Sequence, residues 1–87
     1  MTETRETRLK RLRMRSMRRG IKEMDLILSA FAEARLEAME AEALDRYDAL
    51  LHENDQDLYQ WVTGQVPAPE HYRAMVGEIA QALQKQG

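Results

Sequence analysis

Apolar residues recur at intervals of three and four positions along most of the chain, and this spacing restricts the fold more than any other feature. Ile21, Met24, Leu28 and Phe31 follow it, and residues 72–83 repeat it. Residues three and four apart share one face of an α-helix, whereas a strand alternates apolar and polar side chains. The abundant Ala, Leu, Glu and Arg also favour helices. The sequence therefore predicts an all-α fold, a small five-helix bundle.

A change of phase predicts a break in the middle of the chain. On one straight helix, Leu44, Tyr47 and Leu51 would lie roughly 160–220° around the axis from Phe31, because each residue adds about 100°. A break near Leu36–Glu40 lets both apolar sets face one core. The five expected helices cover about residues 4–18, 21–36, 41–52, 56–63 and 69–83.

Length and composition restrict the class of protein. The 87 residues suffice for one domain, residues 1–87, with 1–3 and 84–87 expected to fray. The chain has no Cys, which excludes disulfides and thiolate metal ligands, and no apolar run approaches the roughly 20 residues that span a bilayer. An Arg-rich start is typical of organellar targeting peptides, but Glu3 and Glu6 argue against one because such peptides contain few acids. We therefore expect a cytoplasmic protein without a membrane partner.

The charges are distributed unevenly along the chain. Residues 1–22 carry nine bases and two acids, whereas residues 23–87 carry four bases and thirteen acids. A basic arm on an acidic body either contacts an anionic partner or neutralises the body internally. For most of Arg5 to Arg13 we expect a solvated helix face.

The sequence offers no constellation for catalysis or for metal binding. His52 and His71 lie on different expected helices and should face solvent, and no convergent set of metal ligands is visible. Ser16 and Ser29 have no neighbouring base in the sequence. Glu23 and Asp25 diverge by about 200° on a helix, so they cannot hold one substrate atom together. We expect a protein that is not an enzyme and holds no metal.

The segment "RRGIKEMD" joins the first two expected helices and carries the most specific pattern in the chain. Gly20 is expected to adopt a positive φ and end the first helix. Arg19-Gly20-x-x-Glu23-x-Asp25 resembles the R-G-x-x-E-x-D signature of the succinate dehydrogenase assembly factors, or flavinators. The segments "DLILSAFAE" and "DQDLYQWVTG" and the Pro-containing entry to the last helix also resemble this family, so the resemblance covers about residues 8–83.

The resemblance implies a five-helix assembly factor that binds the flavoprotein subunit of succinate dehydrogenase, and often that of fumarate reductase. It promotes covalent FAD attachment to a client histidine by largely self-catalysed chemistry. The factor itself is expected to act as a monomer and to carry no cofactor, because the client holds the FAD.

The matching signature residues, together with two arginines added from their spacing, form the expected partner-binding site. It consists of Arg15, Arg18, Arg19, Gly20, Glu23 and Asp25. Arg19 is expected to donate to the client and Gly20 to allow close backbone approach. Purely structural roles stay open: Gly20 as a helix stop, Glu23 at the amides of the second helix, and Asp25 paired with an arginine. Gly20→Arg or Glu23→Ala is expected to keep the fold and abolish flavin attachment.

Two other functions stay open. A basic first helix is compatible with a small nucleic-acid-binding protein, whose affinity would fall steeply with salt. However, the aromatic residues lie outside that helix, which disfavours base stacking. A purely structural adaptor that docks through an amphipathic groove is the third possibility.

Overall fold

The structure, a computed structural model, describes residues 3–86, with side chains for residues 3–83. The expected fraying of residues 1–2 and 87 falls outside the described residues. Glu3 is described, and its carboxylate binds Arg11. The helices are α1 (Arg5–Arg15), α2 (Lys22–Arg35), α3 (Ala41–Leu51), α4 (Asp55–Val62) and α5 (Arg73–Gln86), with short 3₁₀ turns η1 (Leu36–Ala38) and η2 (Glu70–Tyr72). The predicted all-α fold with five helices is confirmed.

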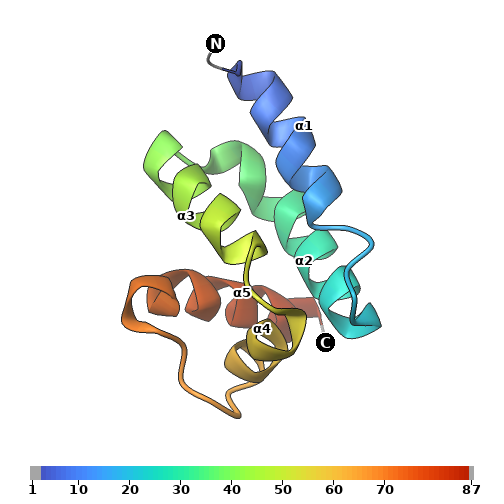
Figure 1. Ribbon diagram of the computed structural model, residues 1–87, viewed down its shortest axis with the longest axis vertical. Coiled ribbons are helices and arrows are strands. Elements are labelled where there is room, and N and C mark those ends of the chain that lie inside the picture. The colour runs from blue at the N-terminus through green and yellow to red at the C-terminus, as the bar shows by residue number, and fades with distance from the viewer. Residues whose placement is uncertain (1–2, 87) are drawn as a thin grey trace.

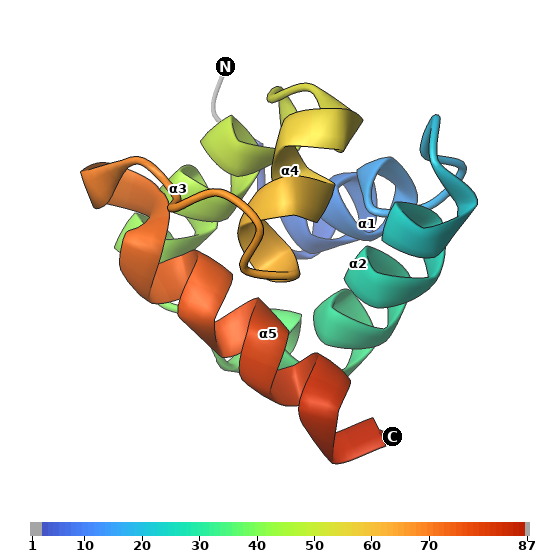
Figure 2. The ribbon, with the colours of Figure 1, turned by 90° about the horizontal axis from the view of Figure 1, so that it is seen from below.

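The second helix lies at the centre of the arrangement. It contacts α1, α4 and α5, so segments far apart in the sequence meet on its surface. In Figure 1, α1 and α3 lie in the upper part of the molecule and α4 and α5 in the lower part, while α2 descends on the right beside both. Figure 2 shows α5 running across this underside. None of the described helices combines the length and the apolarity that crossing a membrane requires.

The buried apolar side chains form one cluster, to which every helix contributes. Met24, Leu28 and Phe31 of α2 and Tyr47 of α3 are at most 1% exposed. The rings of Phe31 and Tyr47 lie 5.7 Å apart between centroids, in a tilted geometry typical of aromatic pairs. The amphipathic stripes that predicted the helices therefore also predicted the core.

The break between α2 and α3 lies where the change of phase predicts it. The 3₁₀ turn η1 ends at Ala38, and Met39 and Glu40 are extended before α3 begins. Buried Leu36 and Met39 keep this connection attached to the core. With the chain broken here, Leu44 of α3 is buried in the same core as Phe31 of α2.

Candidate functional site

The turn between α1 and α2 differs from its predicted form. The first helix ends at Arg15, and Ser16 follows it as the C-cap. The Ser16 hydroxyl donates to the Leu12 carbonyl at 2.8 Å and lies 2.6 Å from the Tyr47 hydroxyl, so the helix end is fastened to α3. The prediction that Gly20 adopts a positive φ is wrong: Arg18 takes the left-handed conformation, with φ of 56°. A side chain there is unfavourable, because its Cβ crowds the backbone.

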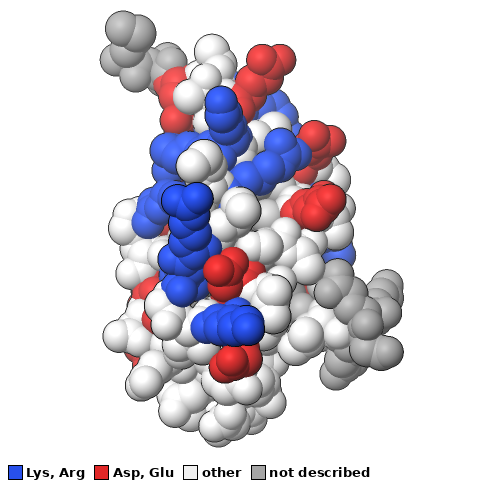
Figure 3. Space-filling model, turned by 90° about the vertical axis from the view of Figure 1, so that its right-hand side faces the viewer, with Lys and Arg blue, Asp and Glu red and all other residues white. Residues whose placement is uncertain are grey.

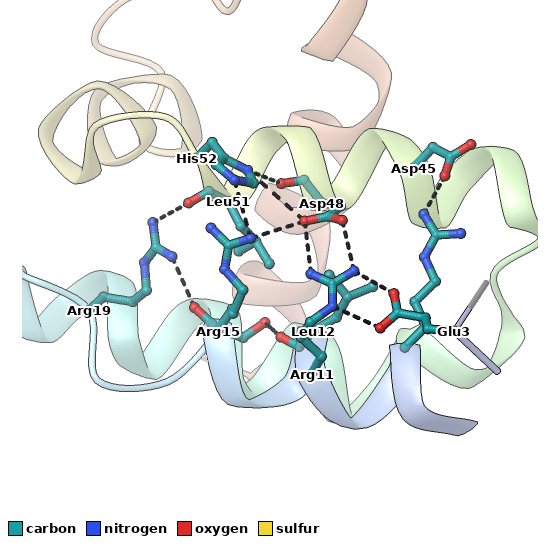
Figure 4. A network of polar contacts seen from close by, with 11 residues as sticks. Glu3, Arg11, Leu12, Arg15, Arg19, Asp45, Asp48, Leu51 and His52 are labelled. Carbon is teal, nitrogen blue, oxygen red and sulfur yellow. Dashed lines mark hydrogen bonds and ion pairs between the residues drawn. The ribbon is translucent and has the colours of Figure 1, made fainter. Parts of the chain in front are cut away.

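A single carboxylate on α4 holds the Arg19-Gly20 pair. Asp55 Oδ1 accepts from Arg19 Nε at 2.9 Å and from Arg19 Nη2 at 2.6 Å, and Asp55 Oδ2 accepts from the Gly20 amide at 2.6 Å. Arg19 also donates to the carbonyls of Arg15 and Leu51 at 2.9 and 3.1 Å (Figure 4). The arrangement of Arg19, Gly20 and Asp55 is called the Asp55 clamp below.

The clamp changes the expected roles of both signature residues. The Arg19 side chain is only 11% exposed, and each of its three nitrogens donates within the chain. Contrary to the expectation, Arg19 therefore does not point outward toward a partner. A Cβ at Gly20 would lie 3.2 Å from Asp55 Oδ2, tighter than an ordinary contact. A side chain at Gly20 would therefore displace the Asp55 carboxylate by a few tenths of an ångström, whether or not a partner approaches.

Arg15 faces α3 at the next contact along the same seam. Its Nη1 lies 3.1 Å from Asp48 Oδ1 and 3.4 Å from His52 Nε2, and Arg11 binds the same carboxylate at 3.0 Å (Figure 4). The hydrogen bond from Arg11, with the positive charges of Arg11 and Arg15, lowers the pKa of Asp48. His52 Nδ1 donates to the Asp48 carbonyl at 2.9 Å, and the His52 ring is mostly exposed, as predicted.

The remaining arginines of α1 also bind the acidic body. Arg5 donates to the carbonyls of Glu37 and Met39 at 2.7 and 2.9 Å, Arg8 pairs with Asp45, and Arg13 pairs with Glu37 at 2.8 Å. Figure 3 shows the resulting surface, on which basic and acidic side chains alternate along this face. The basic face is therefore solvated in part, because Arg5 is exposed and Arg8 and Arg13 are partly exposed, while the contacts of these arginines fit the alternative of internal neutralisation.

Three other members of the expected site lie on the outer side of the turn or at the start of α2. Arg18 and Glu23 are exposed. Asp25 is half-buried, and its Oδ1 accepts from the Ser29 hydroxyl at 3.2 Å. The structure therefore divides the six expected residues into an inward set, Arg15 and Arg19, and an outward set around Gly20 that includes Arg18 and Glu23.

Two features of the polar groups in and around the turn concern metal binding and nucleophilic chemistry. Within the described residues, no group of three His, Cys, Asp or Glu side chains is placed to hold a metal ion. Ser16 is completely buried and binds Tyr47 and a carbonyl, so its hydroxyl faces no substrate.

Sequence reasoning missed the role of Asp55. The sequence places Asp55 where a helix cap is expected, and Asn54 is the residue that caps α4, accepting from the Gln56 amide at 2.8 Å. Asp55 instead binds Arg19 and Gly20, which are 36 and 35 residues earlier in the chain. An aspartate in a first helical turn is common for reasons of the helix dipole alone, so the pattern carried no signal for this long-range contact.

Comparison with known proteins shows which family the chain resembles. Residues 10–85 match the model of a family described as the flavinator of succinate dehydrogenase, Sdh5. A protein of Meyerozyma guilliermondii named succinate dehydrogenase assembly factor 2, mitochondrial, is 44% identical over 86 residues, covering 95% of this chain and 62% of the relative. Relatives with the same name are 48% identical over 77 residues in Candida glabrata and 42% identical over 72 residues in Schizosaccharomyces pombe.

The matches also correct one expectation and set one limit. These relatives are named as mitochondrial proteins, which contradicts the predicted cytoplasmic location. The chain covers 62%, 49% and 52% of the length of these three relatives, so it spans only about half to three-fifths of each.

The family match includes the whole turn and the Asp55 clamp. The resemblance read from the signature is thereby confirmed: the chain belongs to the family of succinate dehydrogenase flavinators.

Proposed function

We propose that the chain promotes covalent attachment of FAD to the flavoprotein subunit of succinate dehydrogenase by binding that subunit. The flavoprotein subunit of fumarate reductase is a second candidate client. The FAD belongs to the client, and one copy of this chain acts on one client.

The mode of action is selection of a reactive conformation. A protein that binds one conformer of its client more tightly increases the population of that conformer, and it needs no reacting group of its own. The turn suits this role, because the Asp55 clamp fixes its backbone while Arg18 and Glu23 stay exposed. A pre-organised surface loses less conformational entropy on binding than a mobile one.

The observation that carries the proposal is the position of the exposed turn inside the segment matched by the family model, residues 10–85. The internal pairing of the basic arm supports the same conclusion. Arginines already bound to Asp45, Asp48 and Asp55 are less available to phosphates, which disfavours a nucleic-acid partner.

Co-expression tests the proposal directly. A flavoprotein subunit is produced with and without the tagged chain, separated on a denaturing gel and examined for flavin fluorescence, which reports covalent FAD alone. We expect strong fluorescence only in the presence of the chain, and recovery of the subunit with the tag. Equal fluorescence in both samples, or recovery of RNA without the subunit, would contradict the proposal.

A further inference from the structure

An apolar groove lies beside the exposed turn. It has a volume of about 310 Å³ and is lined by Glu23, Leu26 and Ile27 of α2, Tyr59 of α4, Thr63 after α4, and Leu83 of α5. Leu26 is 64% exposed and Leu83 is 37% exposed. Two large aliphatic side chains from separate helices thus face solvent at one place, next to a residue of the family signature.

The lining determines what chemistry the groove accepts. Glu23 is the one charged side chain among the six described lining residues, and it is an acid. The Thr63 hydroxyl donates to the Tyr59 carbonyl at 2.7 Å, which leaves few donors for a ligand. A dinucleotide such as FAD carries a diphosphate that requires bases or clustered amides, so the groove does not suit it. An apolar side chain next to a basic residue fits the apolar walls of the groove and the negative charge of Glu23.

The size and position of the groove point to the centre of a larger interface. Stable protein interfaces use roughly 20–30 residues a side, with an apolar centre and a polar rim. The six lining residues are enough only for the apolar centre of an interface. Glu23 connects the groove to the exposed turn, where Arg18 and Lys22 provide polar groups for the rim. A second copy of this chain in the groove would make the chain dimeric, an outcome that the test below includes.

We propose that this groove receives an apolar side chain of the flavoprotein client, flanked by a basic residue that pairs with Glu23. The inference rests on the function proposed above and adds to it a specific docking surface formed by α2, α4 and α5. The turn then orients the client, and the groove supplies most of the apolar contact.

A pair of variants with matched exposure tests the groove. Leu26→Gln removes an aliphatic side chain that is 64% exposed, and Met14→Gln removes one on α1 that is 61% exposed and lies outside the groove. Affinity for the purified flavoprotein subunit is measured by titration, with melting temperatures as a check of folding. We expect Leu26→Gln to weaken binding at least tenfold, and Met14→Gln to change it less than twofold.

The outcomes separate the groove from the proposed function. If Leu26→Gln binds like the wild type while Glu23→Gln binds weakly, the groove proposal is overturned and the function stands. If the wild-type chain neither binds the subunit nor increases its covalent flavin, both proposals fail. If the chain forms dimers in size-exclusion chromatography that Leu26→Gln abolishes without affecting client binding, the groove joins two copies and the proposal is again overturned.

Discussion

The first and second helices are attached to the rest of the molecule by different interactions. The second helix buries Met24, Leu28 and Phe31 in the common core. The first buries only Leu9 and Leu12 and otherwise reaches α3 and its flanks through arginine side chains, in the polar network of Figure 4. Apolar burial involves no titrating group and is not screened by salt, whereas charge pairs at the surface depend on pH and are weakened by screening. The turn that carries the family signature lies where these two kinds of attachment meet.

The largest expected difference in the free energy of unfolding is between changes at a buried and at an exposed leucine of α2. Leu28→Ala should lower the free energy of unfolding by about 2–5 kcal/mol, because it removes fully buried methyl groups and leaves a cavity. Leu26→Ala, at an exposed position on the same helix, should change it by less than about 0.5 kcal/mol. Urea unfolding measures both values. Equal losses would show that α2 is not held by its buried face.

Alkaline pH should weaken the link between α1 and α3 at Tyr47. Burial raises the pKa of Tyr47 to about 12, against opposing effects of the Ser16 hydrogen bond and the Arg19 charge. The folded state therefore favours the neutral phenol. The resulting stability is complete below the unfolded pKa of about 10 and is lost as pH rises from there through about 12, a total of roughly 2–3 kcal/mol.

Urea unfolding at pH 9 and pH 11.5 tests this expectation. Tyr47→Phe should remove most of the alkaline loss, and Tyr59→Phe, the matched control on α4, should retain it. An alkaline loss of the same size in the Tyr47→Phe variant would assign the effect to another group.

Removal of the Asp55 clamp should have an intermediate effect. Asp55→Ala leaves the partly buried Arg19 guanidinium and the Gly20 amide without their acceptor, at a cost of about 1–3 kcal/mol. Asp55→Asn should cost less, because its amide oxygen still accepts one hydrogen bond. Hydrogen exchange at the Gly20 amide reports the local change. Unchanged protection in Asp55→Ala would show that the clamp does not hold the turn.

The smallest expected effect is at the seam between α1 and α3. Asp48→Asn weakens the contacts with Arg11 and Arg15 and should cost about 1 kcal/mol or less, since such pairs are partly solvated. The lowered pKa of Asp48 means that its contribution is present above the unfolded pKa of about 4 and is lost as pH falls through the folded value. The cost should shrink in 1 M salt. A cost independent of salt would indicate packing rather than charge.

The contrast between apolar burial and charge pairing also explains how much of the structure could be predicted from the sequence. Helix positions, the break near Leu36 and the burial of Leu44 and Tyr47 follow from spacings of three and four residues, which are local signals. The inward course of Arg19 depends on Asp55, which is 36 residues away in the sequence. Charged residues fit many surroundings, so their partners are chosen by the tertiary fold rather than by their neighbours in sequence.

The sequence was equally limited for the proposed partner-binding site. The signature correctly located the turn, but it did not separate residues that hold the turn from residues that face outward. Gly20→Arg is therefore no longer a clean test of partner binding, because it also crowds Asp55. Glu23 is exposed in the first turn of α2, and no side chain caps this helix, so a change at Glu23 tests the surface.

The most direct measurement of the proposed role is the covalent flavin on the client when it is co-expressed with Glu23→Gln. Glu42→Gln, an exposed acid in the first turn of α3, is the matched control. We expect at least a tenfold loss of flavin fluorescence with Glu23→Gln, wild-type fluorescence with Glu42→Gln, and unchanged melting temperatures for both. Wild-type fluorescence with Glu23→Gln would contradict the claim that the outer face of this turn recognises the flavoprotein.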